Sequence, residues 1–195
     1  KFNLKKPQIE KIDFFISQII NYNMHTNLVA NSTLENAWDR HILDCLQLSK
    51  HINEKKLKIL DLGTGAGLPG ILLSILGYKN VLMVDSIRKK SDFVKGVIEN
   101  LSLKAKIQNK RIEKMLISQQ DIIVSRALAP LPKLLTYARL HSNKNTTLLF
   151  LKGRNVNNEI EMAQKKFFFD FNLFESKSSG EGFVLKIMNI KKIND

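Results

Sequence analysis

The sequence is poor in residues that form covalent or metal cross-links. Its 195 residues include one cysteine, Cys45, so no disulfide can form within the chain. The four histidines are scattered, and no group of cysteine and histidine has the spacing of a zinc site. These absences exclude a disulfide-stapled domain and a zinc finger, and they favour the reducing cytoplasm as the protein's compartment.

Long hydrophobic runs are also missing. Every apolar stretch is interrupted well before the roughly 20 residues that a membrane-spanning helix needs. The first residues mix charges of both signs and lack the apolar run of a secretory leader. With 44% hydrophobic and 25% charged residues, the composition is typical of a globular protein with a real core, and we expect no membrane partner.

Acidic residues are in short supply. Lys and Arg total 31 against 18 Asp and Glu, which gives a formal net charge of +13. One interpretation is the lysine enrichment that AT-rich genomes produce. The other is a polyanionic partner such as nucleic acid, whose phosphates a basic surface attracts. The charge alone is compatible with both.

The first 55 residues have a helical pattern. Isoleucines recur three and four residues apart between residues 9 and 19, after Pro7, a residue favoured in the first turn of a helix. A second helix is predicted to begin near "STLE", because Ser32 precedes Glu35 by three residues in a capping-box pattern. We therefore expect residues 1–55 to form a helical cap.

From Lys56 onward, short apolar runs alternate with amphipathic stretches. This alternation predicts a doubly wound, mostly parallel α/β sheet with helices on both faces, and we expect residues 56–195 to form it. The last two strands face each other across "KSSGEG", which predicts an antiparallel hairpin at the end of the sheet. The predicted strands cover residues 58–62, 80–85, 104–109, 121–127, 146–153, 167–176 and 182–190.

Glycine is scarce elsewhere but concentrated after the first predicted strand. The stretch "GTGAGLPG" holds four of the nine glycines in eight positions. Gly65, Gly67 and Gly70 satisfy G-x-G-x-x-G, and Asp85 ends the next strand, as in dinucleotide-binding proteins. These glycines allow close approach of a ligand, whereas packing of helix on strand alone would need only one or two of them. No Gly-Lys-Ser/Thr follows, which excludes a phosphate-gripping P-loop.

Asp61 distinguishes among the remaining ligands. It lies near the end of the first predicted strand, beside Gly63, where a fixed carboxylate is badly placed for the pyrophosphate of a dinucleotide. A carboxylate there suits the ammonium and sulfonium groups of S-adenosylmethionine instead. Asp85 is then expected to accept hydrogen bonds from the ribose hydroxyls of that cofactor.

Five motifs extend this interpretation: "RHILDC", "DLGTGAGLPGI", "VDSIRKKSDFV", "VSRALAPL" and "LKG" follow one another along the chain. Together they resemble the bacterial ribosomal RNA small-subunit methyltransferase G family, also called glucose-inhibited division protein B. The resemblance implies a seven-stranded class I, Rossmann-like methyltransferase fold that uses S-adenosylmethionine. It also implies methyl transfer to N7 of a guanine in the 530 loop of 16S ribosomal RNA, with that RNA or the small ribosomal subunit as partner. We expect the protein to act as a monomer.

The resemblance also implies cofactor-binding roles. Carried over by motif, these fall on Gly63 and Leu68 in the glycine loop, on Ile112 and Glu113 beside the adenine, and on Arg126 of "SRA". Arg126 follows a predicted strand at the edge where cofactor and substrate meet. The alternatives are a solvent-exposed charge for Glu113 and, for Arg126, an ion pair with an acid such as Asp61.

Other candidates also have two interpretations. Lys152 lies at the same sheet edge, where it could hold an RNA phosphate or be one more surface lysine. His41 and Asp44 are three residues apart on one helical face, the spacing of a base and its orienting acid. For His41 we favour a packing role with a structural hydrogen bond, and we expect Cys45 in the core.

The chain lacks the motifs of several other methyl transfers. No Asn/Asp-Pro-Pro-Tyr tetrapeptide follows the fourth predicted strand, where amino-group methylases hold the amine, and Cys45 is not in a Pro-Cys loop that could attack a pyrimidine. Guanine N7 carries a lone pair and no proton, so positioning and desolvation suffice for its methylation. Three alternatives stay open: methylation of another RNA position such as the ribose 2′-hydroxyl, a small-molecule or protein methyltransferase, and a non-enzymatic RNA-binding protein with a retained cofactor fold.

Overall fold

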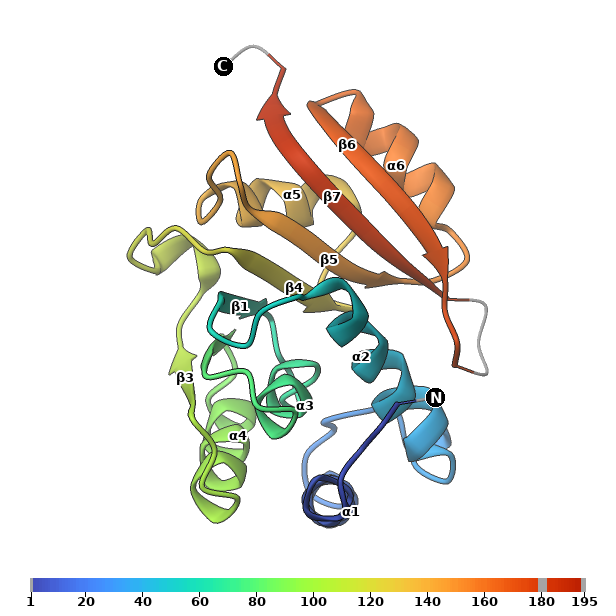
Figure 1. Ribbon diagram of the computed structural model, residues 1–195, viewed down its shortest axis with the longest axis vertical. Helices are drawn as coiled ribbons and strands as arrows, with labels where there is room; N and C mark the ends of the chain where they lie inside the picture. Colours follow the sequence, from blue (N-terminus) through green and yellow to red (C-terminus); the bar gives the residue numbers. More distant parts are fainter. Residues whose placement is uncertain (1, 179–181, 194–195) are drawn as a thin grey trace.

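A seven-stranded sheet forms the centre of the molecule (Figure 1). The computed structural model describes residues 2–178 and 182–193. The strands lie in the order β3-β2-β1-β4-β5-β7-β6, with the first five parallel and β7 antiparallel to both of its neighbours. Their bounds are Lys58–Leu62 (β1), Asn80–Asp85 (β2), Ala105–Asn109 (β3), Ile122–Arg126 (β4), Thr147–Lys152 (β5), Phe167–Glu175 (β6) and Phe183–Lys192 (β7).

The order of the strands confirms the predicted fold class. The chain starts in the middle of the sheet at β1, winds outward to β3, and returns to β4 on the other side of β1. The carboxyl ends of β1, β2 and β4 therefore meet at one edge, beside the point where the winding reverses, and ligands bind there in such sheets. The predicted terminal hairpin is present as the β6–β7 pair. Residues 179–181 of its predicted turn lie outside the described residues.

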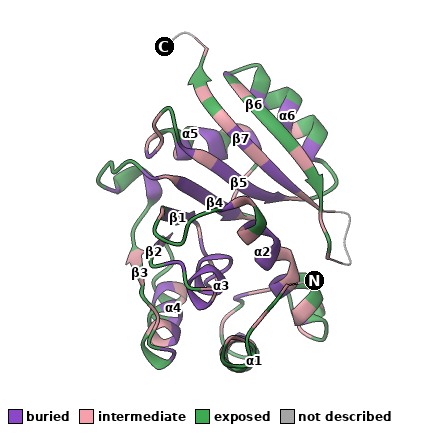
Figure 2. Ribbon diagram, viewed as in Figure 1, coloured by how far each residue is buried: buried purple, intermediate pink, exposed green. Residues whose placement is uncertain are grey.

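Helices cover both faces of the sheet and create two cores. One face packs against α1 (Lys6–Asn23), α3 (Gly70–Ile75) and α4 (Arg88–Asn100), and the other against α5 (Leu131–Arg139) and α6 (Val156–Gln164). Alternate residues of the central strands β1, β2, β4 and β5 contribute to the two cores, as the two-residue period of a strand requires. Figure 2 shows the resulting layer of buried residues in the central strands. Every described helix is too short or too polar to cross a membrane.

The N-terminal segment packs on the same face of the sheet as α3 and α4. Ile12 and Phe15 of α1 are fully buried in that core. The Tyr22 hydroxyl donates a hydrogen bond to the backbone oxygen of Lys89 on α4 (3.1 Å), and its ring packs on Phe93. After α1, the chain forms short turns of helix: η1 (Asn31–Thr33), a π-helical turn η2 (Trp38–Leu43), α2 (Asp44–Leu46) and η3 (Gln47–His51).

The predicted capping box at Ser32 and Glu35 is wrong. The helical segment begins only at Trp38, and no side chain caps it. A different local hydrogen bond replaces the predicted one, because the hydroxyl of the neighbouring Thr33 holds the chain in a turn. Thr33 Oγ1 donates to the Ala30 oxygen (2.6 Å) and also meets Nε2 of His41 (2.7 Å).

Two glycines with opposite surroundings test the packing of α3. An added Cβ at Gly70, the first residue of α3, would lie 2.5 Å from Sδ of the buried Met83 and 2.9 Å from Oδ2 of Asp61. Gly70→Ala should therefore lower the free energy of unfolding by about 1–3 kcal/mol. At Gly96, inside α4, an added Cβ meets nothing within 4 Å. Gly96→Ala should raise the free energy of unfolding by roughly 0.5–1 kcal/mol.

Denaturant unfolding of the two variants measures both changes. Equal effects of the two substitutions would contradict this description of the packing around α3.

Candidate active site

The glycine loop, residues 63–69, joins β1 to α3 and is held from beneath by Asp61. Oδ2 of this fully buried carboxylate accepts hydrogen bonds from the backbone N–H of Gly70 (2.9 Å) and from the Thr64 hydroxyl (2.6 Å). Burial raises the pKa of Asp61 to about 7, against the lowering effect of these two donors. Gly63 has a positive φ of 65°, and a side chain there would run into Leu128 of the β4–α5 loop. Thus the loop can lie against its neighbour only with glycine at this position.

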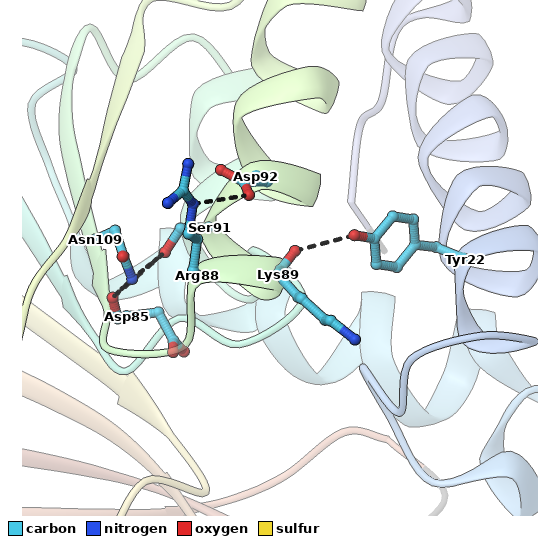
Figure 3. A network of polar contacts seen from close by, with 7 residues as sticks. All are labelled: Tyr22, Asp85, Arg88, Lys89, Ser91, Asp92 and Asn109. Carbon is cyan, nitrogen blue, oxygen red and sulfur yellow. Dashed lines mark hydrogen bonds and ion pairs between the residues drawn. The ribbon is translucent and has the colours of Figure 1, made fainter.

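Asp85, at the end of β2, holds the top of the same loop. One carboxylate oxygen accepts the N–H of Gly65 (2.9 Å) and the other accepts the N–H of Ile87 (2.8 Å). Its backbone oxygen accepts from Nδ2 of Asn109 (3.0 Å), and Figure 3 shows the carboxylate pointing away from that contact. Each carboxylate oxygen keeps a further lone pair, so Asp85 can accept two hydroxyl groups while it holds the loop.

A first cavity of about 530 Å³ opens above the glycine loop, and Asp85 lines it. Leu68 and Ile112 supply apolar surface, and Tyr137 of α5 also faces this space. Glu113 lies on its exposed rim, where its own backbone N–H, together with the Tyr137 hydroxyl, lowers the pKa of the carboxyl. The other lining residues are Leu28, Val29, Ala30, Gly63, Thr64, Gly65, Ala66, Val84, Ser86, Ile87, Lys90, Lys110, Arg111, Arg126, Ala127 and Leu128.

A second cavity, of about 860 Å³, adjoins the first. The two share three lining residues at the end of β4, Arg126, Ala127 and Leu128. The second cavity is otherwise walled by the cap, by the end of β5 and by residues next to the β6–β7 turn. Its remaining lining residues are Thr33, Arg40, His41, Asp44, Ala129, Pro130, Leu151, Lys152, Gly153, Arg154, Glu159, Ser178 and Gly182.

Arg126, between the two cavities, is anchored by the cap. One terminal N–H group of its guanidinium donates to Nδ1 of His41 (2.5 Å), and the other meets Sγ of Cys45 (3.7 Å). Burial, with the positive charges of Arg126 and Arg40, lowers the pKa of His41 to about 4. His41 is therefore neutral near pH 7, with Nδ1 as acceptor and Nε2–H as donor to Thr33.

The structure separates the sequence-predicted residues into two groups. Gly63, Gly65, Leu68, Asp85, Ile112, Glu113 and Arg126 all line the first cavity. Asp61 and Gly67 do not line it. Gly67 packs against Ile71 of α3, and Asp61 lies beneath the loop. Asp61 supports the loop through Oδ2, and its direct contact with a cationic ligand stays a prediction.

Lys152 is a buried, ion-paired lysine that lines the second cavity. Its side chain is only 7% exposed, and its ammonium group donates to the backbone oxygen of Ala129 (3.0 Å) and to Oε2 of Glu159 (2.6 Å). The same Oε2 accepts the N–H of Leu131 at the start of α5 (2.6 Å). The Lys152–Glu159 ion pair thus ties β5 and α6 to the loop that follows Arg126. The interpretation of Lys152 as one more surface lysine is wrong, whereas its contact with an RNA phosphate stays a prediction.

His41 and Asp44 do not form the pair of base and orienting acid that their spacing allows. The partners of His41 are Arg126 and Thr33, whereas Oδ1 of Asp44 accepts from Gln47 (3.0 Å). The structural role favoured for His41 is therefore confirmed. No acid lies within ion-pair distance of Arg126 in the described part of the chain, so the predicted alternative of an Asp61–Arg126 ion pair is wrong.

Sequence reasoning missed part of the first cavity. Leu28, Val29 and Ala30 reach it from the cap, and Tyr137 reaches it from α5. No motif in the sequence marks these residues as part of a cavity. The first three follow α1, and Tyr137 belongs to an ordinary amphipathic helix. Lys110 and Arg111, which also line it, immediately precede the predicted Ile112.

The fold has close counterparts among solved structures. A TehB-like S-adenosylmethionine-dependent methyltransferase from Corynebacterium glutamicum matches with a TM-score of 0.61 and 18% identity, over 94% of this chain and 99% of that one. Magnesium protoporphyrin IX methyltransferase from Synechocystis, solved with bound S-adenosylmethionine, matches with a TM-score of 0.62 and 11% identity, over 97% and 100% of the two chains. These likenesses concern the fold.

The residues around the first cavity fit S-adenosylmethionine. Gly65, whose added Cβ would meet no side chain within 4 Å, leaves the loop open to a ligand. Asp85 offers free lone pairs for two ribose hydroxyls, and Leu68 and Ile112 offer apolar surface for an adenine. The fold and this cavity together define a class I, S-adenosylmethionine-dependent methyltransferase.

Sequence comparison identifies the family within this class. The family model for rRNA small subunit methyltransferase G matches residues 8–182. Proteins with the name ribosomal RNA small subunit methyltransferase G are 35% identical in Orientia tsutsugamushi and 36% identical in Rickettsia prowazekii. Each alignment covers 95% of this chain, and 93% and 96% of the respective relatives. The chain belongs to the rRNA small subunit methyltransferase G family.

Replacing Asp85 tests the cofactor site. Asp85→Ala should weaken binding of S-adenosylmethionine at least tenfold in calorimetry, because hydrogen bonds to a carboxylate contribute about 1.5–3 kcal/mol each. Asp92→Ala is the matched control, since Asp92 is exposed on α4 and pairs only with Arg88. If Asp85→Ala folds like the control and keeps the wild-type affinity, Asp85 is not a ligand-binding residue.

The neutral state of His41 predicts a pH dependence of stability. The folded-state pKa of His41, about 4, lies below its ordinary value of 6.5, so the stability linked to the neutral ring is present above pH 6.5 and is lost as the pH falls towards 4. Wild type should lose up to about 2 kcal/mol more than His41→Asn between pH 7.5 and pH 5. Denaturant unfolding at the two pH values measures this, and a pH-independent difference between the two proteins contradicts it.

Proposed function

We propose that this methyltransferase transfers the methyl group of S-adenosylmethionine to N7 of a guanine in the 530 loop of 16S ribosomal RNA. Its partner is then that RNA or the small ribosomal subunit, its compartment the cytoplasm, and its active form a monomer. Family membership supports the substrate, and the formal charge of +13 suits a phosphate-rich partner.

The observation that carries the proposal is the position of Arg126. It lines both cavities, so a base in the second cavity and a cofactor in the first would meet at this side chain. Its guanidinium is held from the cap side by His41 and has no carboxylate partner among the described residues. A cation in this place can donate a hydrogen bond to O6 of guanine, the acceptor beside N7 on the same edge, and this leaves the lone pair of N7 free for the methyl group.

The reaction then needs positioning more than proton transfer. When bound, S-adenosylmethionine supplies an electrophilic methyl group. Guanine N7 has a free lone pair and no proton to lose, so no base is required. His41, the one histidine at the site, is neutral, and both of its ring nitrogens are engaged with Arg126 and Thr33. The role of these residues is to fix the geometry of the two reacting groups.

The proposal also assigns a role to each of the two parts of the chain. Residues 56–195 form the methyltransferase domain and hold the cofactor through Asp85, Leu68 and Ile112. Residues 1–55 form a cap that closes the first cavity with Leu28–Ala30 and the second with His41. The cap thereby places Arg126 for the incoming base.

Ribose 2′-hydroxyl methylation is less well supported. That reaction needs a lysine and an acid that can share a proton with the hydroxyl group. The Lys152–Glu159 pair lines the second cavity, but each member is already committed to the backbone, Lys152 to Ala129 and Glu159 to Leu131. This pair therefore serves the structure of the loop.

The chemistry of the product tests the proposal. Methylation of N7 puts a positive charge on the purine, so RNA treated with the enzyme and S-adenosylmethionine should be cut at a single guanosine by borohydride followed by aniline. Naked 16S RNA and purified small subunits are offered side by side, with reactions lacking S-adenosylmethionine as controls. Labelled N6-methyladenine or 2′-O-methylribose, or methyl incorporation without a cleavable site, would overturn the N7 assignment and leave the methyltransferase class intact.

A further inference from the structure

The second cavity contains a carboxylate that the methyl-transfer reaction does not use. Asp44 of α2 lines this cavity but not the first one. It is partly buried, at the place where the cap meets the end of β6. Its partners hold it firmly, so its direction is set by the fold.

The two oxygens of Asp44 have different surroundings. Oδ1 accepts three hydrogen bonds, from Nε2 of Gln47 (3.0 Å), Oγ of Ser176 (3.0 Å) and Oγ of Ser178 (3.3 Å). Oδ2 has no hydrogen-bond partner among residues 2–178 and 182–193, and it is not one of the buried polar atoms left unsatisfied. The carboxylate is thus anchored through Oδ1, and the described residues leave Oδ2 without a donor. A polar side chain held in this way is typical of a preorganised binding site.

The chemistry of guanine matches two charged residues that line this cavity. The edge with N7 and O6 carries acceptors, whereas the opposite, Watson–Crick edge carries the N1–H and 2-amino donors. The cavity has the cation Arg126 on the wall that it shares with the first cavity, and the anion Asp44 on a wall that it does not share. A guanine that turns its N7 edge towards Arg126 and the cofactor carries its donors on the other edge, where a carboxylate of the same cavity such as Asp44 can accept them.

We propose that Asp44 is the specificity residue that reads the Watson–Crick edge of the target guanine through its free oxygen. This inference rests on the proposed function, because it takes the second cavity as the site of the base. The base must leave its stack to enter, as in other enzymes that modify bases, and about 860 Å³ accommodates a nucleotide. Adenine is rejected at the same time, because its N1 is an acceptor and would face a carboxylate.

The test exchanges both partners of the contact. Three RNA substrates carry guanosine, inosine or 2-aminopurine at the target position. Inosine lacks the 2-amino group, and 2-aminopurine lacks both the N1–H and O6, yet both keep N7. The loss of O6 affects wild type and Asp44→Asn alike, so only the difference between the two enzymes reports on Asp44. Labelled methyl transfer gives kcat/KM of wild type and of Asp44→Asn on each substrate.

Wild type should prefer guanosine at least tenfold over one or both analogues, and Asp44→Asn should reduce that preference to threefold or less. The analogue whose rejection is lost identifies the donor that Asp44 contacts. Asp92→Asn, an exposed acid-to-amide change on α4, should keep the wild-type preferences.

A purely structural Asp44 gives another result. If Asp44 only joins the cap to the β6–β7 pair, Asp44→Asn lowers kcat/KM by one factor for all three substrates and leaves the preferences unchanged. That outcome overturns the inference while the proposed function stands. Failure of wild type to methylate the guanosine substrate overturns the proposed function, and the inference with it.

Discussion

The shape of the cofactor site depends on one buried carboxylate that holds the glycine loop in place. Asp61 is fully enclosed, yet its Oδ2 binds the start of α3 and the Thr64 hydroxyl from beneath the glycine loop. Asp85 holds the same loop at Gly65, from the end of the neighbouring strand. Because β1 and β2 are paired in register, with Asp61 opposite Met83, these two anchors cannot move independently. The glycine loop is therefore a fixed platform on which a cofactor can be recognised without a large rearrangement.

The arrangement of the second cavity depends on the contacts between the N-terminal segment and the end of β4. Neutral His41 links the guanidinium of Arg126 to Thr33, and Thr33 in turn binds the Ala30 oxygen. Ala30 lines the first cavity and Thr33 lines the second. A change in the cap at either cavity would thus reach Arg126 through two side chains. The Lys152–Glu159 pair supports the opposite side of the same loop.

The sequence was sufficient to predict the elements whose apolar residues repeat regularly and the loop that is rich in glycine. All seven strands, the α/β class and the glycine turn followed from apolar alternation and from glycine spacing. The start of the second cap segment did not, because Thr33 hydrogen bonds replace the local capping pattern of Ser32. Two neighbouring hydroxyl residues can each bind the local backbone, and the sequence alone does not decide between them.

The roles of charged residues were harder to predict than their locations. Arg126 was expected at the cofactor edge and lies there, but its partner His41 comes from a segment 85 residues earlier in the chain. Lys152 and Asp61 were also placed on the correct strands. Their burial and partners depend on α6 and on the start of α3, which no pattern in the sequence connects to them. The same holds for Asp44, because its serine partners Ser176 and Ser178 lie 132 and 134 residues further along the chain.

The central claim is that two adjoining cavities meet at Arg126, one for the cofactor and one for the base. A structure of the complex with S-adenosylhomocysteine tests it most directly. The account predicts ribose hydroxyls on the Asp85 carboxylate, adenine against Leu68 and Ile112, and the sulfur directed towards Arg126 with the second cavity empty. An S-adenosylhomocysteine molecule seated between Asp44 and Lys152, or bound without contact to Asp85, would contradict it.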